Sequence, residues 1–277
     1  MNAAAPFHGK VALVAGASRG IGAATACAFA RAGASVVLAA RDEAALTEVA
    51  RMIEERGGAA LAVRADVTDA DSMKALVART LDAFGRLDAA FNNATDGPRP
   101  APLADIEPDD FDRAIRTNVR GTFLGMKYQI RAMLRTGGGA IVNMASTAGL
   151  RGVANLAGYV AGKAGIIGLT KVAALDYADQ NIRVNVVAPG PILTHHLEAA
   201  GEEAQRMAGQ ATAMQRVGRA DEVAATVLWL CSDQASYITG ATVPIDGGQM
   251  AGVKPPKMYR PGAPPAAAAG SPNAPRG

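Results

Sequence analysis

Short apolar runs alternate with amphipathic segments along most of this chain of 277 residues. The apolar runs contain almost no polar residues, which is typical of strands buried on both faces. The longer segments between them repeat apolar residues at helical spacing. We therefore expect strands at residues 11–14, 36–39, 61–63, 87–91, 140–144, 184–187 and 242–245.

Helices are expected between these runs, and several of their ends carry recognisable signals. Asp42 can cap a helix with its side chain, and Gly33, Gly57 and Gly85 each follow a segment where a helix would stop. The predicted helices cover about residues 20–32, 42–56, 71–84, 108–134 and 221–231, with a further helix around Tyr159.

This alternation predicts an α/β fold with one doubly wound, seven-stranded parallel sheet and helices on both faces. A single domain accounts for residues 10–252, and residues 1–9 form an N-terminal extension. Residues 253–277 are rich in Pro, Ala and Gly, a composition that cannot build a core, so we expect a disordered tail there. A partner-binding motif in that tail is the alternative.

Composition bounds the location and the partners of the chain. The N-terminus does not have the charged region followed by an apolar run that marks a secretory signal peptide, and no apolar stretch is long enough to span a bilayer. We therefore expect a cytoplasmic protein with no membrane partner. Four of the 28 basic residues lie beyond Val253, and the other 24 nearly balance the 25 acidic residues. This balance argues against nucleic acid as a partner. Cys27 and Cys231 lie far apart and do not suggest a disulfide framework.

A glycine-rich turn, Gly16-Ala-Ser18-Arg19-Gly20-Ile21-Gly22, follows the first predicted strand. Glycines let the backbone turn tightly and approach a pyrophosphate at the positive end of the next helix. Alone this signal is weak, because such glycines also allow a helix to pack closely on a sheet. Ligands in such folds bind at the carboxyl ends of strands, where further candidates lie: Arg41, Asp66, Asn93, Ser146 and Pro189-Gly190.

Tyr159 and Lys163 are four residues apart, so on a helix they share one face. A fixed cation beside a phenol favours the phenolate, and we expect Lys163 to lower the pKa of Tyr159 from its ordinary value of roughly 10. Tyr159 could then donate and accept a proton while Ser146 holds a carbonyl or hydroxyl oxygen. By itself, the pair also fits an amphipathic helix with a solvated lysine.

Together these residues resemble the short-chain dehydrogenase/reductase superfamily in its single-domain Rossmann form. The resemblance covers roughly residues 10–248 and rests on motifs in the family's order: Gly16-x-x-x-Gly20-x-Gly22, Asn92-Asn93-Ala94, Asn118, Ser146, Tyr159-x-x-x-Lys163 and Pro189-Gly190-x-Ile192-x-Thr194. The resemblance implies that the catalytic residues are Asn118, Ser146, Tyr159 and Lys163. It implies a cofactor site formed by Gly16, Ser18, Arg19, Gly20, Ile21, Gly22, Arg41, Asp66, Val67, Asn93, Tyr159, Lys163, Pro189, Gly190, Ile192 and Thr194.

The resemblance also implies individual roles within the site. The Asp66 side chain and the Val67 backbone would contact the adenine, although Asp66 could instead only cap a turn. Lys163 would hold the ribose hydroxyls of the nicotinamide half. Asn118 would anchor a water that links Lys163 to solvent, or simply bond back to its own helix. The segment from Pro189 to Thr194 would hold the nicotinamide carboxamide.

The end of the second predicted strand decides between the two nicotinamide cofactors. Relatives that prefer NAD(H) resemble one another in carrying an acid there, whereas this chain has Ala40 followed by Arg41. Arg41 and Arg19 could both form charge-assisted hydrogen bonds with a 2'-phosphate, so we predict NADP(H), with NAD(H) as the alternative. Asp42 would bring an acid into range if the strand ended one residue later.

Two positions depart from the pattern that the chain otherwise resembles. Most relatives have Thr where Ala15 stands, and Gly where Thr95 follows Asn92-Asn93-Ala94. A hydroxyl is therefore lost from one strand and gained at the end of its neighbour, which either compensates or reshapes the crevice. Compensation predicts that Thr95→Gly destabilises the fold.

We expect no metal site. Neighbouring side chains at His195-His196 point apart, and no acidic or Cys partner stands at a metal-ligand spacing from them. A substrate lid over residues 193–210 is the better interpretation. Four arginines of the predicted helix at 108–134 and one directly after it form either a solvated face or a surface for an acidic carrier protein: Arg113, Arg116, Arg120, Arg131 and Arg135.

The resemblance implies an oxidoreductase that transfers hydride between NADP(H) and a carbonyl or secondary alcohol, with Tyr159 as general acid and base. Within this class, a 3-oxoacyl or polyketide ketoreductase is the best-known neighbour. The alternative is a nucleotide-binding redox sensor without turnover, but the retention of all four catalytic residues argues against it. The substrate would be a small molecule, and the resemblance suggests a homotetramer or a homodimer.

Overall fold

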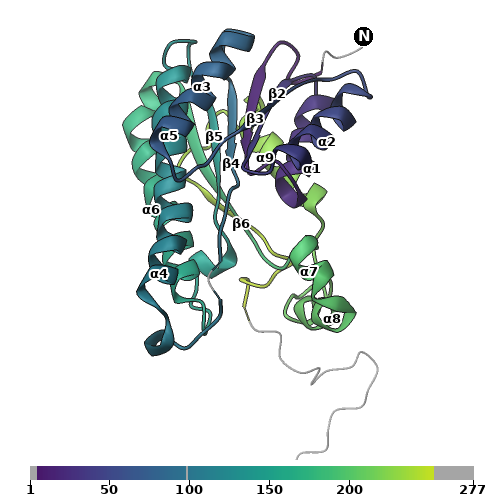
Figure 1. The fold of residues 1–277 in the computed structure, drawn as a ribbon, viewed down its shortest axis with the longest axis vertical. Coiled ribbons are helices and arrows are strands. Elements are labelled where there is room, and N and C mark those ends of the chain that lie inside the picture. The colour runs from purple at the N-terminus through teal and green to yellow at the C-terminus, as the bar shows by residue number, and fades with distance from the viewer. Residues whose placement is uncertain (1–4, 98, 253–277) are drawn as a thin grey trace, which may run out of the picture.

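A seven-stranded parallel sheet forms the centre of the molecule (Figure 1). The computed structural model describes residues 5–97 and 99–252. The strands follow the order β3-β2-β1-β4-β5-β6-β7, which confirms the predicted sheet. Their bounds are β1 (Val11–Ala15), β2 (Ser35–Ala40), β3 (Ala59–Arg64), β4 (Ala89–Asn92), β5 (Gly139–Met144), β6 (Ile182–Pro189) and β7 (Thr242–Ile245).

Helices cover both faces of the sheet, as Figure 1 shows. On one face lie α1 (Gly20–Arg31), α2 (Glu43–Glu54) and α9 (Ala220–Cys231), and on the other lie α3 (Ala70–Phe84), α5 (Gly121–Met133) and α6 (Ala157–Tyr177). Successive side chains of a strand point to opposite faces of the sheet, so alternate strand residues pack into two separate hydrophobic cores. Val14 thus packs in one core with Phe29, whereas Leu13 packs in the other with Met73.

Side chains and glycines define the helix ends largely as the sequence predicts. The Asp42 carboxylate accepts a hydrogen bond from the Ala45 amide at 3.1 Å and caps α2. Asp69 caps α3 in the same way through the amide of Ser72. Gly85 ends α3 at φ +74°, a left-handed conformation that glycine adopts without a steric penalty.

The long helix predicted at residues 108–134 is interrupted. It consists of α4 (Pro108–Ile115), a π-helical turn at Arg116–Arg120, and α5. A π turn inserts one extra residue per turn and is often found at functional sites. The preceding strand also differs from expectation, since β4 begins at Ala89 rather than at residue 87.

The segment expected as a lid is helical and is closed at its base. It contains α7 (His195–Ala199) and α8 (Gly201–Gln210), which lie to one side of the sheet (Figure 1). Ile192 forms a parallel bridge with Gly218 where the segment leaves and returns. The Leu193 amide donates to the Gly218 oxygen at 2.8 Å, and the Gly218 amide donates to the Pro191 oxygen at 2.9 Å.

The predicted N-terminal extension contributes to the core. Phe7 is buried, and its ring meets that of Phe29 edge-on at a centroid distance of 5.1 Å. The predicted tail at residues 253–277 lies outside the described residues. Among the residues that the structure describes, no helix has the length and apolar character needed to cross a membrane.

Candidate active site

A cleft of about 440 Å³ opens where the strand order reverses between β1 and β4. Ligands in doubly wound sheets bind at such a point, because neighbouring crossovers there run to opposite faces. Ten of the residues implied as cofactor ligands line this cleft: Gly16, Ser18, Arg19, Gly20, Ile21, Arg41, Asp66, Val67, Asn93 and Thr194.

The glycine turn at the start of α1 leaves no room for side chains. Gly16 has φ +82°, and a Cβ there would lie 2.7 Å from the Ala94 nitrogen. A Cβ on Gly22 would lie only 2.0 Å from the Gly16 oxygen, which accepts a hydrogen bond from Asn93 Nδ2 at 2.8 Å. The N-cap residue of α1, Arg19, makes no side-chain hydrogen bond to the first amides of this helix. This turn therefore suits the pyrophosphate of a dinucleotide, whose charge the helix N-terminus would stabilise.

Three charged side chains lie at the end of β2. Arg19 Nη2 is 3.1 Å from Asp42 Oδ2, in an ion pair that is about half exposed. The other Asp42 oxygen caps α2, and the exposed Arg41 precedes it. Asp42 thus lies within range of the cleft that it lines, and both of its oxygens have partners.

Asp66 also lines the cleft, two residues after the end of β3. Its Oδ1 accepts hydrogen bonds from the Thr68 amide at 2.9 Å and the Thr68 hydroxyl at 2.8 Å. Burial acts to raise the pKa of Asp66, but the Thr68 hydrogen bonds and the charges of Arg41 and Arg64 outweigh it and lower the pKa. Asp66 therefore caps a turn and also presents a carboxylate to the cleft.

Ser146 stands just beyond β5 and begins the short helical turn Thr147–Gly149. Its hydroxyl accepts a hydrogen bond from the Ala148 amide at 3.2 Å and lies 3.5 Å from the Pro189 oxygen. Ser146 is also close enough to the Tyr159 phenol, in the first turn of α6, for its hydroxyl to act to lower the pKa of that phenol. The strand end and the helix thus bring Ser146 and Tyr159 together.

Lys163 lies one turn further along α6, with its side chain fully buried. Its Nζ donates to the Met144 oxygen at 3.0 Å and lies 5.5 Å from the centroid of the Tyr159 ring. Burial disfavours the charged form and lowers the pKa of Lys163 to about 7.

The pKa of Tyr159 is shifted in the opposite direction from the one that the sequence predicts. Burial raises it above its ordinary value, and the hydrogen bond with Ser146 only partly opposes the rise. The expectation that Lys163 lowers this pKa is therefore wrong for the protein on its own. The physical reason is that the same buried environment penalises the charge of both side chains.

Asn118 lies in the π-helical turn and is completely buried. Its Nδ2 donates to the Ala114 oxygen at 2.9 Å and the Asp96 oxygen at 2.8 Å, and its Oδ1 accepts from the Thr95 hydroxyl at 2.9 Å. It packs directly on α6, because a Cβ on Gly162 would lie 2.9 Å from the Asn118 Cβ. Asn118 thus bonds back to its own helix and also holds the loop after β4.

Six of the implied cofactor residues, Tyr159 and Lys163 among them, lie outside the lining of the cleft. Gly22 packs against the glycine turn, and Pro189 is the last residue of β6. Gly190 packs against Asp246, since a Cβ there would lie 3.0 Å from the Asp246 Cα. Ile192 lines a second cavity of about 270 Å³.

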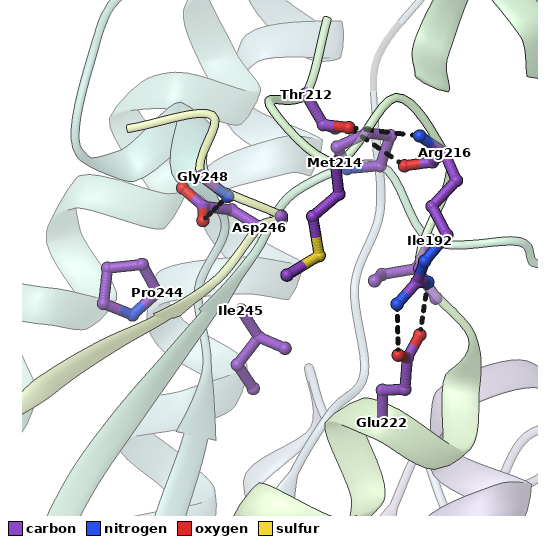
Figure 2. A pocket seen from close by; sticks show the side chains of 12 residues that line it. Ile192, Thr212, Met214, Arg216, Glu222, Pro244, Ile245, Asp246 and Gly248 are labelled. Atoms are coloured by element: carbon purple, nitrogen blue, oxygen red, sulfur yellow. Dashed lines mark hydrogen bonds and ion pairs between the residues drawn. The ribbon is translucent and has the colours of Figure 1, made fainter. Parts of the chain in front are cut away.

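The second cavity lies between the base of the lid and the end of β7. Met214 extends into it, and Arg216 forms a two-bond ion pair with Glu222 at its edge (Figure 2). Asp246 accepts hydrogen bonds from the amides of Gly248 and Met250. The charged groups at this cavity are thus satisfied by one another and by the backbone.

The cleft also contains residues that were not predicted to line it. Thr95, Thr117 and His195 are among them. Thr117 adjoins Asn118, and His195 follows Thr194, so their places next to motif residues were the available signals. Within the described ranges, no three His, Cys, Asp or Glu side chains are grouped as a metal site would require.

Comparison with known proteins identifies the family. A family model described as enoyl-(acyl carrier protein) reductase matches residues 16–250. A short chain dehydrogenase/reductase of Aspergillus oryzae is 39% identical over 248 residues, which cover 87% of this chain and 95% of that protein. The chain is a short-chain dehydrogenase/reductase.

Other members of this short-chain dehydrogenase/reductase family agree closely with it. A cyclohexanol dehydrogenase of Acinetobacter sp. is 43% identical over 241 residues, which cover 87% of this chain and 95% of the relative. The crystal structure of levodione reductase superposes with a TM-score of 0.85 at 36% identity, covering 89% of this chain and 100% of that one. This short-chain dehydrogenase/reductase is accordingly an oxidoreductase of a family that binds a nicotinamide dinucleotide.

Proposed function

We propose that this protein transfers hydride between NADP(H) and a small ketone or secondary alcohol, with Tyr159 moving the proton. The meeting of Ser146, Tyr159 and Lys163 carries this proposal. Two relatives, a cyclohexanol dehydrogenase and a levodione reductase, support by their names an alcohol or ketone as the substrate class.

The side chains divide the work in the reducing direction. When bound, the nicotinamide supplies the hydride that adds to the carbonyl carbon. Ser146 and Tyr159 donate hydrogen bonds to the carbonyl oxygen, where negative charge develops. The Tyr159 proton then passes to that oxygen and completes the alcohol. The raised pKa of Tyr159 keeps the phenol protonated at neutral pH and ready to act as the acid.

Lys163 has two proposed tasks. Its protonated form stabilises the Tyr159 phenolate that remains after proton donation, because Lys163 Nζ lies over the ring at 5.5 Å from its centroid. It would also hold the ribose hydroxyls of the cofactor, and Asn118 would link it to solvent through a water. In the oxidising direction the same groups act in reverse, with the phenolate accepting the alcohol proton.

Charge at the end of β2 supports NADP(H) over NAD(H). Arg19 and Arg41 both line this part of the cleft. The Asp42 carboxylate is occupied by Arg19 and the Ala45 amide, which reduces its repulsion of a 2'-phosphate. A carboxylate at the position of Asp42 can also bind the ribose 2'-hydroxyl of NAD(H), so NAD(H) is the competing cofactor.

Two narrower proposals concern the substrate subclass and the assembly. The description of the matching family model supports an acyl-carrier-linked substrate, as in a 3-oxoacyl or polyketide ketoreductase. Exposed apolar residues on α5 and α6 support a homotetramer or homodimer, since Phe123, Val172 and Leu175 are 46%, 56% and 83% exposed. Light scattering on the purified protein tests the assembly.

Turnover by the purified protein tests the proposed function. NADPH and NADH oxidation is measured with a panel of ketones, aldehydes, quinones and 3-oxoacyl thioesters, and with the Tyr159→Phe variant. We expect that variant to lose at least about a thousandfold in kcat, given the usual size of general acid catalysis and the lost hydrogen bond. Tyr237→Phe is the matched control, because the fully exposed Tyr237 loses the same oxygen far from the cleft. Tight NADPH binding without turnover on any substrate would favour the redox-sensor alternative.

A further inference from the structure

The Thr95 hydroxyl is the partner of the Asn118 side-chain oxygen. Thr95 Oγ1 lies 2.9 Å from Asn118 Oδ1. Asn118 Nδ2 faces two main-chain oxygens, those of Ala114 and Asp96, so the amide can have only one orientation. Asn118 Oδ1 is therefore the acceptor, and the Thr95 hydroxyl must be the donor.

The hydrogen bond from Thr95 fixes the Asn118 side chain, whose amide nitrogen is already held by two main-chain oxygens. Asn118 is completely buried, so losing the hydroxyl would leave its oxygen unsatisfied away from water. The loop that supplies Thr95 is held as well, because Arg113 Nε lies 3.2 Å from Asp96 Oδ2. Hydrogen bonds between Asn118 and both Thr95 and Asp96 thus join the loop after β4 to the π-helical turn.

The same threonine lines the cofactor cleft. Since its only proton is donated to Asn118, its oxygen can offer the cleft nothing but lone pairs. The ligand group that suits it is a donor, such as a ribose hydroxyl. Thr95 thus stands between the cleft and the Asn118 side chain.

We propose that Thr95 is a positioning residue, which holds Asn118 in its working orientation and links that orientation to the cofactor cleft. The proposal rests on the proposed reductase function. In this role, the contribution of the Thr95 side chain at the end of β4 is its hydroxyl, which orients Asn118 through the hydrogen bond between them.

A set of threonine variants tests this role. Thr95→Val removes the hydroxyl and keeps the shape, and Thr95→Ser restores the hydroxyl. Thr80→Val is the control, because the Thr80 hydroxyl also donates one hydrogen bond, to the Leu76 oxygen within α3, although Thr80 is buried and Thr95 is exposed. Each variant is made in the wild-type chain and in an Asn118→Ala background, and kcat, KM, the pH profile of kcat and Tm are measured.

We expect Thr95→Val to lower kcat about tenfold and to shift its pH profile, as the loss of one partly buried hydrogen bond predicts. Thr95→Ser should recover most of the lost kcat, and Thr80→Val should leave it unchanged. In the Asn118→Ala background, Thr95→Val should change kcat less than about twofold, because its effect acts through Asn118.

Several results would overturn the proposal. A Thr95→Val variant with a lower Tm but a normal kcat and pH profile would show a purely structural contact. An equal drop in kcat with and without Asn118 would show that Thr95 acts by another route. A wild-type protein without turnover would overturn the reductase function itself, and the proposed role of Thr95 in it; this failure is distinguishable because it appears before any substitution is made.

Discussion

The buried nitrogen of Lys163 lies 5.5 Å from the centroid of the Tyr159 ring. Burial lowers the pKa of the lysine to about 7 and raises that of the tyrosine. The two groups are therefore both neutral above pH 7, whereas the lysine is charged and the phenol protonated below it. The pair changes its charge close to physiological pH through the lysine rather than through the tyrosine.

The pH dependence of reduction should follow Lys163. We expect kcat/KM, which reports the free enzyme, to fall as the pH rises through about 7, because Lys163 loses the charge that stabilises the phenolate. The measurement is kcat/KM for ketone reduction between about pH 5.5 and 9, with the pKa of about 7 as the midpoint. Lys163→Met should lack this step, and Lys171→Met, an exposed lysine on the same helix, should retain it. A profile that is flat through pH 7 would contradict the assignment.

The same lysine should make the folded state more stable at alkaline pH. Its pKa is about 7 in the folded protein and 10.5 ordinarily, so between these values the unfolded chain binds more protons. Stability contributed by the neutral lysine is thus complete above pH 10.5 and is lost as the pH falls toward 7. We expect the wild-type free energy of unfolding to rise by about 2 kcal/mol from pH 7 to 9 relative to Lys163→Met. Urea unfolding of both proteins at pH 7 and 9 measures these free energies. The same change in unfolding free energy between the two pH values in wild type and Lys163→Met would contradict the prediction.

Cofactor preference should respond in opposite directions to two neighbouring substitutions. Arg41→Ala should weaken NADPH binding about tenfold and leave NADH binding nearly unchanged, because only NADPH carries the 2'-phosphate. Asp42→Asn should strengthen NADPH binding, since it releases Arg19 from the ion pair. Asparagine caps helices as well as aspartate does, so α2 should remain intact. Fluorescence titration measures both dissociation constants, and equal changes for the two cofactors would argue against NADP(H).

Two glycine-to-alanine substitutions should have opposite effects. Gly22→Ala places a Cβ 2.0 Å from the Gly16 oxygen, and we expect a loss of more than about 3 kcal/mol of stability together with cofactor binding. Gly168 lies on the exposed side of α6 with nothing within 4 Å of its Cβ position. Gly168→Ala should stabilise the protein by up to about 1 kcal/mol. Thermal unfolding of both variants compares them, and a folded Gly22→Ala variant with an unchanged Tm would contradict the close approach of the two backbones.

The sequence predicts the sheet well because its strands are buried on both faces. All seven apolar runs become strands, and the run at 242–245 matches β7 at both ends. The error at β4 has a simple origin. Leu87 is fully buried and apolar, but it lies before the residues that pair with β1, and hydrophobicity alone does not distinguish burial from pairing.

Other features depend on tertiary contacts that no local pattern contains. The apolar spacing around Asn118 is that of an ordinary helix, so the π-helical turn could not be anticipated. The direction of the Tyr159 pKa shift depends on how deeply both it and Lys163 are buried, and the four-residue spacing gives only their proximity. The motif residues were found because each carries its own chemistry, whereas Thr95 was visible only as a departure and its bond to Asn118 became visible only in three dimensions.

The bridge between Ile192 and Gly218 makes the lid segment a replaceable module. Because the two ends of the lid segment are bonded to each other, the segment joins the sheet at the same geometry whatever residues lie between Ile192 and Gly218. Changing the length of such a loop alters its closure entropy only slowly, so insertions and deletions there cost little stability. The segment expected to cover the substrate can therefore diverge among related proteins while the glycine turn and the Tyr159 helix stay unchanged, and exchanging residues 193–217 between family members would test whether this segment sets the substrate range.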